Sequence, residues 1–166
     1  MRNLVAVPVI LLAVLLQSAV VSRVELLSGF ADLPLVMLAA WALQDEVETA
    51  WHWAVATGLM VGFVSGLSWV VPVLGYVFVV AFAQVFQRRV WQAPLLAMFG
   101  VTFLGTVLNS VLTLGVLRIG GTPLPFTDVL GLLTLPAILL NMLLAIPVYA
   151  VMRDLARWVY PSLEVE

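Results

Sequence analysis

The sequence predicts an all-α polytopic integral membrane protein, with about six transmembrane helices packed in one compact bundle. Hydrophobic residues make up 64% of the 166 residues and charged residues only 10%, and the mean hydropathy is +1.17. A soluble domain carries about 25% charged residues. Because a spanning helix needs about 20 apolar residues, five or six crossings use up the chain. We therefore expect a single transmembrane domain over residues 1–166.

The apolar runs predict where the helices lie. The six spans are expected at about Leu4–Val21, Leu33–Leu43, Ala50–Trp69, Val73–Phe86, Pro94–Leu117 and Val129–Met152. The first imitates a signal peptide, but its apolar run exceeds the usual length of about 7–15 residues, so we interpret it as an uncleaved span. The second is too short to cross upright, and it either borrows preceding residues or lies in a thinned bilayer. We interpret Val70–Pro72 as a tight turn.

Arginine placement predicts that both termini lie in the cytoplasm, because cytoplasmic loops are enriched in Lys and Arg. With six spans and the N-terminus inside, only Arg23 and Arg118 lie outside. The other five of the seven basic residues are then cytoplasmic: Arg2, Arg88, Arg89, Arg153 and Arg157. The tryptophans fall near span ends, where indole rings favour the headgroup region: Trp41, Trp51, Trp53, Trp69, Trp91 and Trp158.

Composition also bears on the class of function. A net charge of −2 offers no basic surface for nucleic acid. The absence of cysteine excludes disulfides, thiolate metal sites and cysteine catalysis. His52 is expected at the membrane interface, so little remains for a metal centre. We predict no enzyme, no cofactor and no metal.

The ionisable residues are expected at span ends or in loops: Asp32, Asp45, Glu46, Glu48, His52 and Asp128. An ionisable residue inside a membrane marks a functional site by default. With none expected near mid-membrane, an ion-coupled pump or an intramembrane hydrolase has little support. Asp128 is interpreted as opening the last helix, where a carboxylate favours the positive end of the dipole.

Small residues recur at every fourth position of the third span. Ala50, Ala54, Gly58, Gly62 and Gly66 are expected on one helix face. Such a face lets another helix backbone approach closely, and close packing drives helix association in lipid. Packing against a neighbouring span is one interpretation. The alternative is that Gly58, Gly62 and Gly66 dock the helix of a partner.

Polar residues form a stripe on the fifth span. Thr102, Thr106, Asn109 and Thr113 share one face, with Ser110 alongside. Polar groups need hydrogen-bond partners away from water, which predicts bonds between helices. The alternatives are a partner-facing stripe or a substrate cavity completed by polar residues of other spans: Gln17, Gln84 and Asn141.

Two prolines flank Asn141 in the last span. Pro136 and Pro147 each remove a backbone hydrogen bond and tend to kink the helix. We expect Asn141 to satisfy carbonyls that the prolines free. A broken-helix ligand site, as in transporters, is the alternative.

Several short motifs follow one another along the chain. They are Leu-Leu-Gln17-Ser18, Gly29…Asp32-Leu-Pro34-Leu, Gly62-Phe-Val-Ser-Gly66-Leu, Gly75, and Pro136…Asn141…Ala145-Ile-Pro147-Val-Tyr149. In this order they resemble the bacterial rod shape-determining MreD family. The chain departs from the family at Val70, where the family usually has an aspartate, and in the reversed order of the acid and the proline before the second span.

The resemblance implies a multi-pass protein of the bacterial inner membrane that supports peptidoglycan synthesis and rod cell shape. Family members bind the single-span protein MreC and are linked to the MreB filament, the glycosyltransferase RodA and a class B penicillin-binding protein. Their six-helix fold is similar to the substrate-binding components of energy-coupling-factor vitamin transporters. We expect a non-enzymatic scaffold that contacts partners through Gly58, Gly62, Gly66, Arg118 and Asp128. A small-molecule-binding subunit of an uptake transporter is the alternative.

Overall fold

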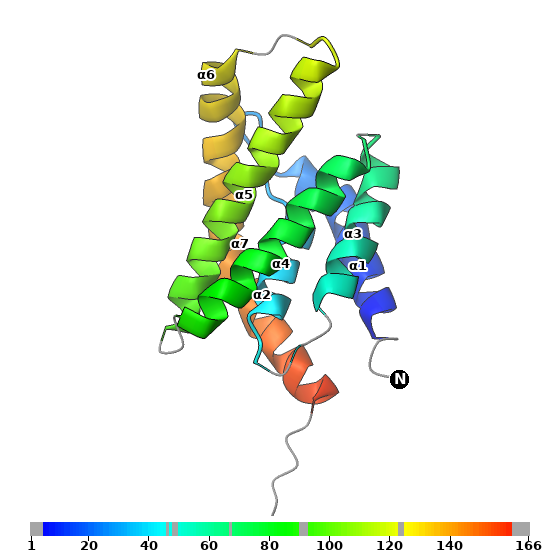
Figure 1. Ribbon diagram of the computed structural model, residues 1–166, viewed down its shortest axis with the longest axis vertical. Coiled ribbons are helices and arrows are strands. Elements are labelled where there is room, and N and C mark those ends of the chain that lie inside the picture. The colour runs from blue at the N-terminus through cyan, green and yellow to red at the C-terminus, as the bar shows by residue number, and fades with distance from the viewer. Residues whose placement is uncertain are drawn as a thin grey trace, which may run out of the picture.

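The computed structural model describes residues 5–45, 47, 50–66, 68–89, 93–122 and 125–160, which form a compact bundle of α-helices (Figure 1). The helices are α1 (Ala6–Ala19), α2 (Leu33–Ala42), α3 (Ala50–Ser65), α4 (Val70–Arg89), α5 (Pro94–Ile119), α6 (Phe126–Asp128) and α7 (Leu135–Val159). A π-helical segment, Val129–Thr134, joins α6 to α7. Three stretches are long and apolar enough to cross a membrane, as in a multi-pass membrane protein: Val70–Arg88, Pro94–Ile119 and Phe126–Val159.

The connection between α1 and α2 is irregular. A short 3₁₀ helix, Val21–Arg23, leads into two-residue strands β1 (Glu25–Leu26) and β2 (Gly29–Phe30), which pair in antiparallel register. Ser28 between the strands donates its backbone N–H to the carbonyl oxygen of Leu132, at 3.2 Å, in the π-helical segment. The hairpin therefore packs against the segment before α7 through Ser28 and the buried Gly29, while Leu26, Leu27 and Phe30 remain exposed.

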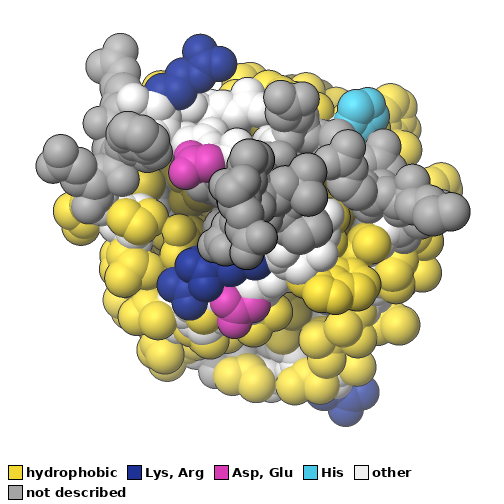
Figure 2. Space-filling model, turned by 90° about the horizontal axis from the view of Figure 1, so that it is seen from below, with side chains coloured by type: hydrophobic (Ala, Val, Ile, Leu, Met, Phe, Trp, Pro, Cys, Tyr) yellow, Lys and Arg dark blue, Asp and Glu magenta, His cyan; other side chains and the backbone are white. Residues whose placement is uncertain are grey.

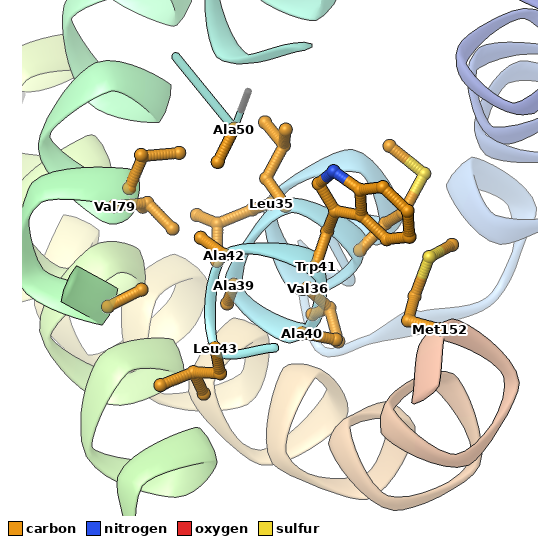
Figure 3. Close-up of a cluster of buried hydrophobic side chains, with 14 of the residues drawn as sticks. Leu35, Val36, Ala39, Ala40, Trp41, Ala42, Leu43, Ala50, Val79 and Met152 are labelled. Atoms are coloured by element: carbon orange, nitrogen blue, oxygen red, sulfur yellow. The ribbon is translucent and has the colours of Figure 1, made fainter. Parts of the chain in front are cut away.

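Helix α2 occupies the centre of the bundle and contacts α1, α3, α4, α5 and α7. Every residue from Pro34 to Ala42 is buried. Figure 3 shows Leu35, Val36 and Trp41 of α2 packed among residues that include Val79 of α4 and Met152 of α7. The ten residues of α2 extend about 15 Å, half of a hydrocarbon core of about 30 Å. Because other helices shield it, α2 does not have to span the bilayer by itself.

The turn between α3 and α4 differs from the prediction. Val70–Pro72 was expected to be a tight turn, but it forms the start of α4, whereas α3 already ends at Ser65. Pro72 fits there because the first N–H groups of a helix have no intrahelical acceptor. Gly66 adopts a left-handed φ of +67°, which glycine accepts without steric cost. The proline therefore belongs to the helix start and the glycine to the turn.

The small residues of α3 pack against α4. A Cβ atom on Gly58 would lie 2.6 Å from the Cα of Val73, and one on Gly62 would lie 2.8 Å from the Cα of Trp69. The two backbones therefore touch where side chains are missing. A partner helix would have to displace α4 to use this face. Gly66 follows the end of α3, and a Cβ there would meet nothing within 4 Å, so it does not continue the expected ladder.

Two tryptophans pack inside the bundle. The rings of Trp41 and Trp53 stack with centroids 4.4 Å apart, and both side chains are buried. The expectation that these indoles face the headgroup region is therefore wrong, since helix packing encloses them. Trp51, Trp69 and Trp158 are exposed, and Trp91 lies outside the described residues.

Charged groups gather at the end of the bundle where α1 and α3 begin and α2, α4 and α7 end (Figure 1). Figure 2 views this end and shows arginine, acidic and histidine side chains surrounded by hydrophobic ones. The helix ends place these described residues there: Asp45, His52, Arg88, Arg153, Asp154 and Arg157. Arg2, Glu46, Glu48 and the side chain of Arg89 lie outside what the structure describes.

Candidate functional site

Asp32 lies at the N-terminus of α2, in the interior of the bundle. Its Oδ1 accepts the backbone N–H of Leu35 at 3.0 Å, which is the usual contact of an N-capping aspartate. Pro34 in the first turn has no N–H to satisfy. The sequence Asp-Leu-Pro therefore starts a helix at a partly buried position between the other helices.

Side chains from α4 and α5 surround the Asp32 carboxylate. The hydroxyl of Tyr76 donates to Oδ1 at 3.0 Å and approaches Oδ2 at 3.3 Å. The Nδ2 of Asn109 donates to Oδ2 at 3.3 Å. Both partners lie within helices long enough to cross a membrane. Asp32 lies at the start of the second span, as expected, but its carboxylate bonds to side chains of two of these long helices.

Asn141 of α7 holds the start of α2 in place. Its Oδ1 accepts the backbone N–H of Asp32 at 2.7 Å, and its Nδ2 donates to Thr106 Oγ1 on α5 at 2.9 Å. Thr106 in turn donates to the carbonyl oxygen of Thr102 at 2.7 Å. Asn141 was expected to satisfy carbonyls freed by the prolines. Instead, it is fully buried and joins three parts of the fold.

The carbonyl freed by Pro136 has another partner. Proline has no N–H, so the carbonyl oxygen of Leu132, four residues earlier, lacks its α-helical donor. That oxygen accepts the N–H of Ser28. Gly29 makes the approach possible, because a Cβ there would lie 2.5 Å from the carbonyl oxygen of Leu133. The hairpin thus packs against the π-helical segment that precedes Pro136.

Gln17 of α1 secures the other side of the connection. Its Nε2 donates to the carbonyl oxygen of Ala31 at 2.8 Å, and its Oε1 accepts the N–H of Leu33 at 2.8 Å. These two backbone groups flank Asp32. A single amide therefore satisfies both a donor and an acceptor of irregular backbone that cannot reach water.

Two cavities adjoin Asp32, with volumes of about 200 Å³ and about 410 Å³. The smaller lies between the hairpin, α5 and the π-helical start of the last helix, and the larger lies between α1, α3, α4 and α5. Among the described residues, Asp32 is the only charged one that lines either cavity. Four residues line both cavities: Phe30, Asp32, Asn109 and Thr113.

The structure brings together three of the four polar residues predicted from the spans. Gln17, Asn109 and Asn141 meet around the start of α2. Gln84 lies about 12 Å further along α4 than Tyr76, since eight residues separate them at about 1.5 Å each, and it lines neither cavity. Thr106, Ser110 and Thr113 line the smaller cavity, so the stripe on α5 both bonds to other helices and faces open space.

The remaining predicted site residues lie at the far end of the molecule. Arg118 is in the last turn of α5 and Asp128 is in the first turn of α6, and both side chains are exposed. They flank the connection between α5 and α6. Neither residue lines a cavity beside Asp32, so this connection is separate from the polar centre.

Sequence reasoning missed Asp32 and Tyr76. Asp32 is adjacent to Pro34 and an apolar run, which is a signal for a helix start, but nothing local places that start in the interior. Tyr76 offers no motif of its own. In the part of the chain that the structure describes, no group of three or more His, Cys, Asp or Glu residues could hold a metal ion. The chemistry available is therefore one carboxylate, three amides and several hydroxyls beside open space.

No protein-family model, no curated protein and no solved structure matches this chain.

Proposed function

We propose that this protein is a non-enzymatic membrane scaffold of the MreD type. It holds MreC and, through the complex, RodA, a class B penicillin-binding protein and MreB, and so supports wall synthesis and rod shape. In this arrangement the chain crosses the inner membrane six times, and both termini are cytoplasmic. The family resemblance further implies a fold similar to that of the substrate-binding components of energy-coupling-factor transporters.

One observation carries the proposal. Three of the motifs behind the resemblance meet at one joint: Gln17 binds the carbonyl of Ala31, Asn141 binds the backbone of Asp32, and Gly29 lies against the helix turn that contains Pro136. The motif that contains Gly62 packs elsewhere, against Trp69. Residues whose contacts determine how the chain folds are the ones that members of a family with a common fold would share. What supports the resemblance is that three of its separated motifs form a single structural unit.

The protruding end of α5 and α6 is the proposed contact for a partner outside the cytoplasm. In Figure 1 these helices extend beyond the ends of α3 and α4. Their tips carry Arg118 and Asp128 beside the exposed Ile119 and Phe126, whose side chains are 89% and 52% exposed. Apolar side chains flanked by opposite charges suit a protein partner that lies close to the membrane surface.

Co-purification tests the scaffold. The protein is co-expressed with MreC from its own host, extracted in mild detergent and isolated through a tag on this chain. We expect a stoichiometric complex that is weakened at least tenfold by Ile119→Asp. Phe63→Asp is the matched control, because Phe63 is similarly exposed, at 87%, but lies on α3. Absence of the complex in the unaltered protein, or rod shape that persists after depletion of this protein, would refute the proposal.

A small-molecule-binding subunit of an uptake transporter is the second candidate, and the cavities beside Asp32 favour it. Its test is mass spectrometry of small molecules retained by the purified protein. Asn109→Leu should release such a ligand, since Asn109 lines both cavities and makes only one long bond to Asp32. A retained metabolite in the absence of MreC would replace the scaffold with the transport function.

A further inference from the structure

The charge on Asp32 exceeds what the fold requires. Asparagine caps helices about as well as aspartate does, and an ionised side chain inside a membrane is costly. The donors around the carboxylate are all neutral: the N–H of Leu35, the hydroxyl of Tyr76 and the amide of Asn109. In the described part of the chain, the only ion pair joins Arg153 and Asp154, so Asp32 has no cationic partner there.

The two carboxylate oxygens are not equally occupied. Oδ1 accepts two bonds of 3.0 Å, whereas the contacts of Oδ2 with Tyr76 and Asn109 are both 3.3 Å. A carboxylate offers about four lone-pair positions, so Oδ2 keeps room for a further donor. This oxygen belongs to a residue that lines both cavities.

The larger cavity has the character of a site for a small organic molecule. Its volume of about 410 Å³ lies within the range of about 300–1,000 Å³ for ligand pockets, which are mostly apolar with a few polar groups. Its apolar wall is made by residues of α1, α3 and α4: Val14, Val61, Val64, Val71 and Pro72. A metal ion is a poor fit, because hard cations prefer about six oxygen ligands.

We propose that this cavity binds an organic ammonium ion attached to an apolar body. The ammonium group donates to Asp32 Oδ2 and supplies the positive charge that the described neighbours lack, while the apolar body lies against α1, α3 and α4. Thr113, at the boundary of the two cavities, offers its hydroxyl oxygen as a second acceptor. Such a site requires no partner protein, so its failure leaves the scaffold proposal untouched.

The experiment compares 2-phenylethylammonium with 2-phenylethanol, which has the same body without the charge. Binding to the purified full-length protein in detergent is measured by calorimetry at neutral pH. We expect the amine to bind at least tenfold more tightly than the alcohol, and Asp32→Asn to reduce this preference to about one. Asp154→Asn is the matched control, because it removes a carboxylate whose side chain is 69% exposed and that lines neither cavity, and it should leave the preference unchanged.

A second pair of variants keeps the test decisive if Asp32→Asn does not fold. Thr113→Phe places a ring at a residue that lines both cavities, and it should weaken amine binding at least tenfold. Ser110→Phe adds the same ring three residues away and enters only the smaller cavity, so binding should persist. Equal affinity for amine and alcohol in the unaltered protein, or amine binding that survives Thr113→Phe, would overturn the proposal.

Discussion

Replacing Asn141 with leucine removes the side chain that connects α7 to the start of α2 and to α5. The change nearly preserves volume, so its main effect is on hydrogen bonds. The N–H of Asp32 loses its 2.7 Å acceptor, and the hydroxyl of Thr106 loses one donor but keeps its bond to the carbonyl of Thr102. One buried donor is thus left unsatisfied.

The expected loss follows from that single orphaned group. An unsatisfied buried donor costs about 1–3 kcal/mol, whereas hydrogen bonds between membrane helices average about 0.6 kcal/mol in double-mutant cycles. We expect Asn141→Leu to lower the free energy of unfolding by about 2 kcal/mol, because the N–H of Asp32 loses its 2.7 Å acceptor. Titration with sodium dodecyl sulfate, followed by far-ultraviolet circular dichroism, measures this difference.

Two further variants separate the contributions. Gln84→Leu changes a half-buried amide outside the polar centre and should cost less than about 0.5 kcal/mol, as is usual away from such features. A double-mutant cycle with Thr106→Val isolates the bond between Asn141 and Thr106. This bond should account for the smaller part of the destabilisation caused by Asn141→Leu. If Asn141→Leu costs no more than Gln84→Leu, the view of Asn141 as the joint of the fold is wrong.

Three more variants test separate parts of the fold in the same unfolding assay. Gly29→Ala should destabilise the protein by more than about 1 kcal/mol, because its Cβ would lie 2.5 Å from a backbone oxygen. Gly115→Ala is the control: it lies inside α5 with nothing within 4 Å, and it should stabilise the protein by about 0.5–1 kcal/mol. Equal effects of the two variants would contradict the packing of the hairpin. Gly62→Leu should destabilise by several kcal/mol, because α4 touches α3 there, and a neutral result would leave this face open to a partner. Gln17→Leu should cost about 1–3 kcal/mol, since it strips two backbone groups of their partners.

The sequence predicts the helices well because their signals are local. Apolar runs and flanking charges place α1, α2 and α5 within a few residues of their observed bounds. The four-residue spacing in α3 correctly indicates a close helix contact at Gly58 and Gly62, but not the neighbour that makes it. The prediction for Gly66 is wrong because glycine also terminates helices. The four-residue spacing alone does not distinguish a glycine that packs against a helix from one that ends a helix.

The candidate site is only half predictable because it depends on contacts between distant residues. The polar stripe on α5 is visible as a pattern, and Asn109 and Thr106 do line a cavity. The bond between Asp32 and Asn141 joins residues 109 positions apart, and no local pattern reports such a pairing. Asp32 looks like a loop residue since the chain before it is polar, yet that segment folds inward against α7.

The stability of Asp32→Asn joins the fold to the proposed ligand site. The amide oxygen of an asparagine at this position can keep the bonds from Leu35 and Tyr76, and rotation of the Asn109 amide turns its oxygen toward the new NH₂ group. No buried charge then remains in the apolar interior. We expect the unliganded variant to be as stable as the unaltered protein, or more stable by up to about 1 kcal/mol.

A clear loss of stability would carry the opposite meaning. If Asp32→Asn unfolds more easily by more than about 1 kcal/mol, the charge contributes to the fold through the positive end of the α2 dipole, and no ligand is needed to explain it. If Asp32→Asn keeps the stability of the unaltered protein but loses the preference for the amine, the carboxylate of Asp32 does not contribute to folding and serves ligand binding instead. Such a result is typical of binding sites, and it would assign the charge of Asp32 to ligand recognition.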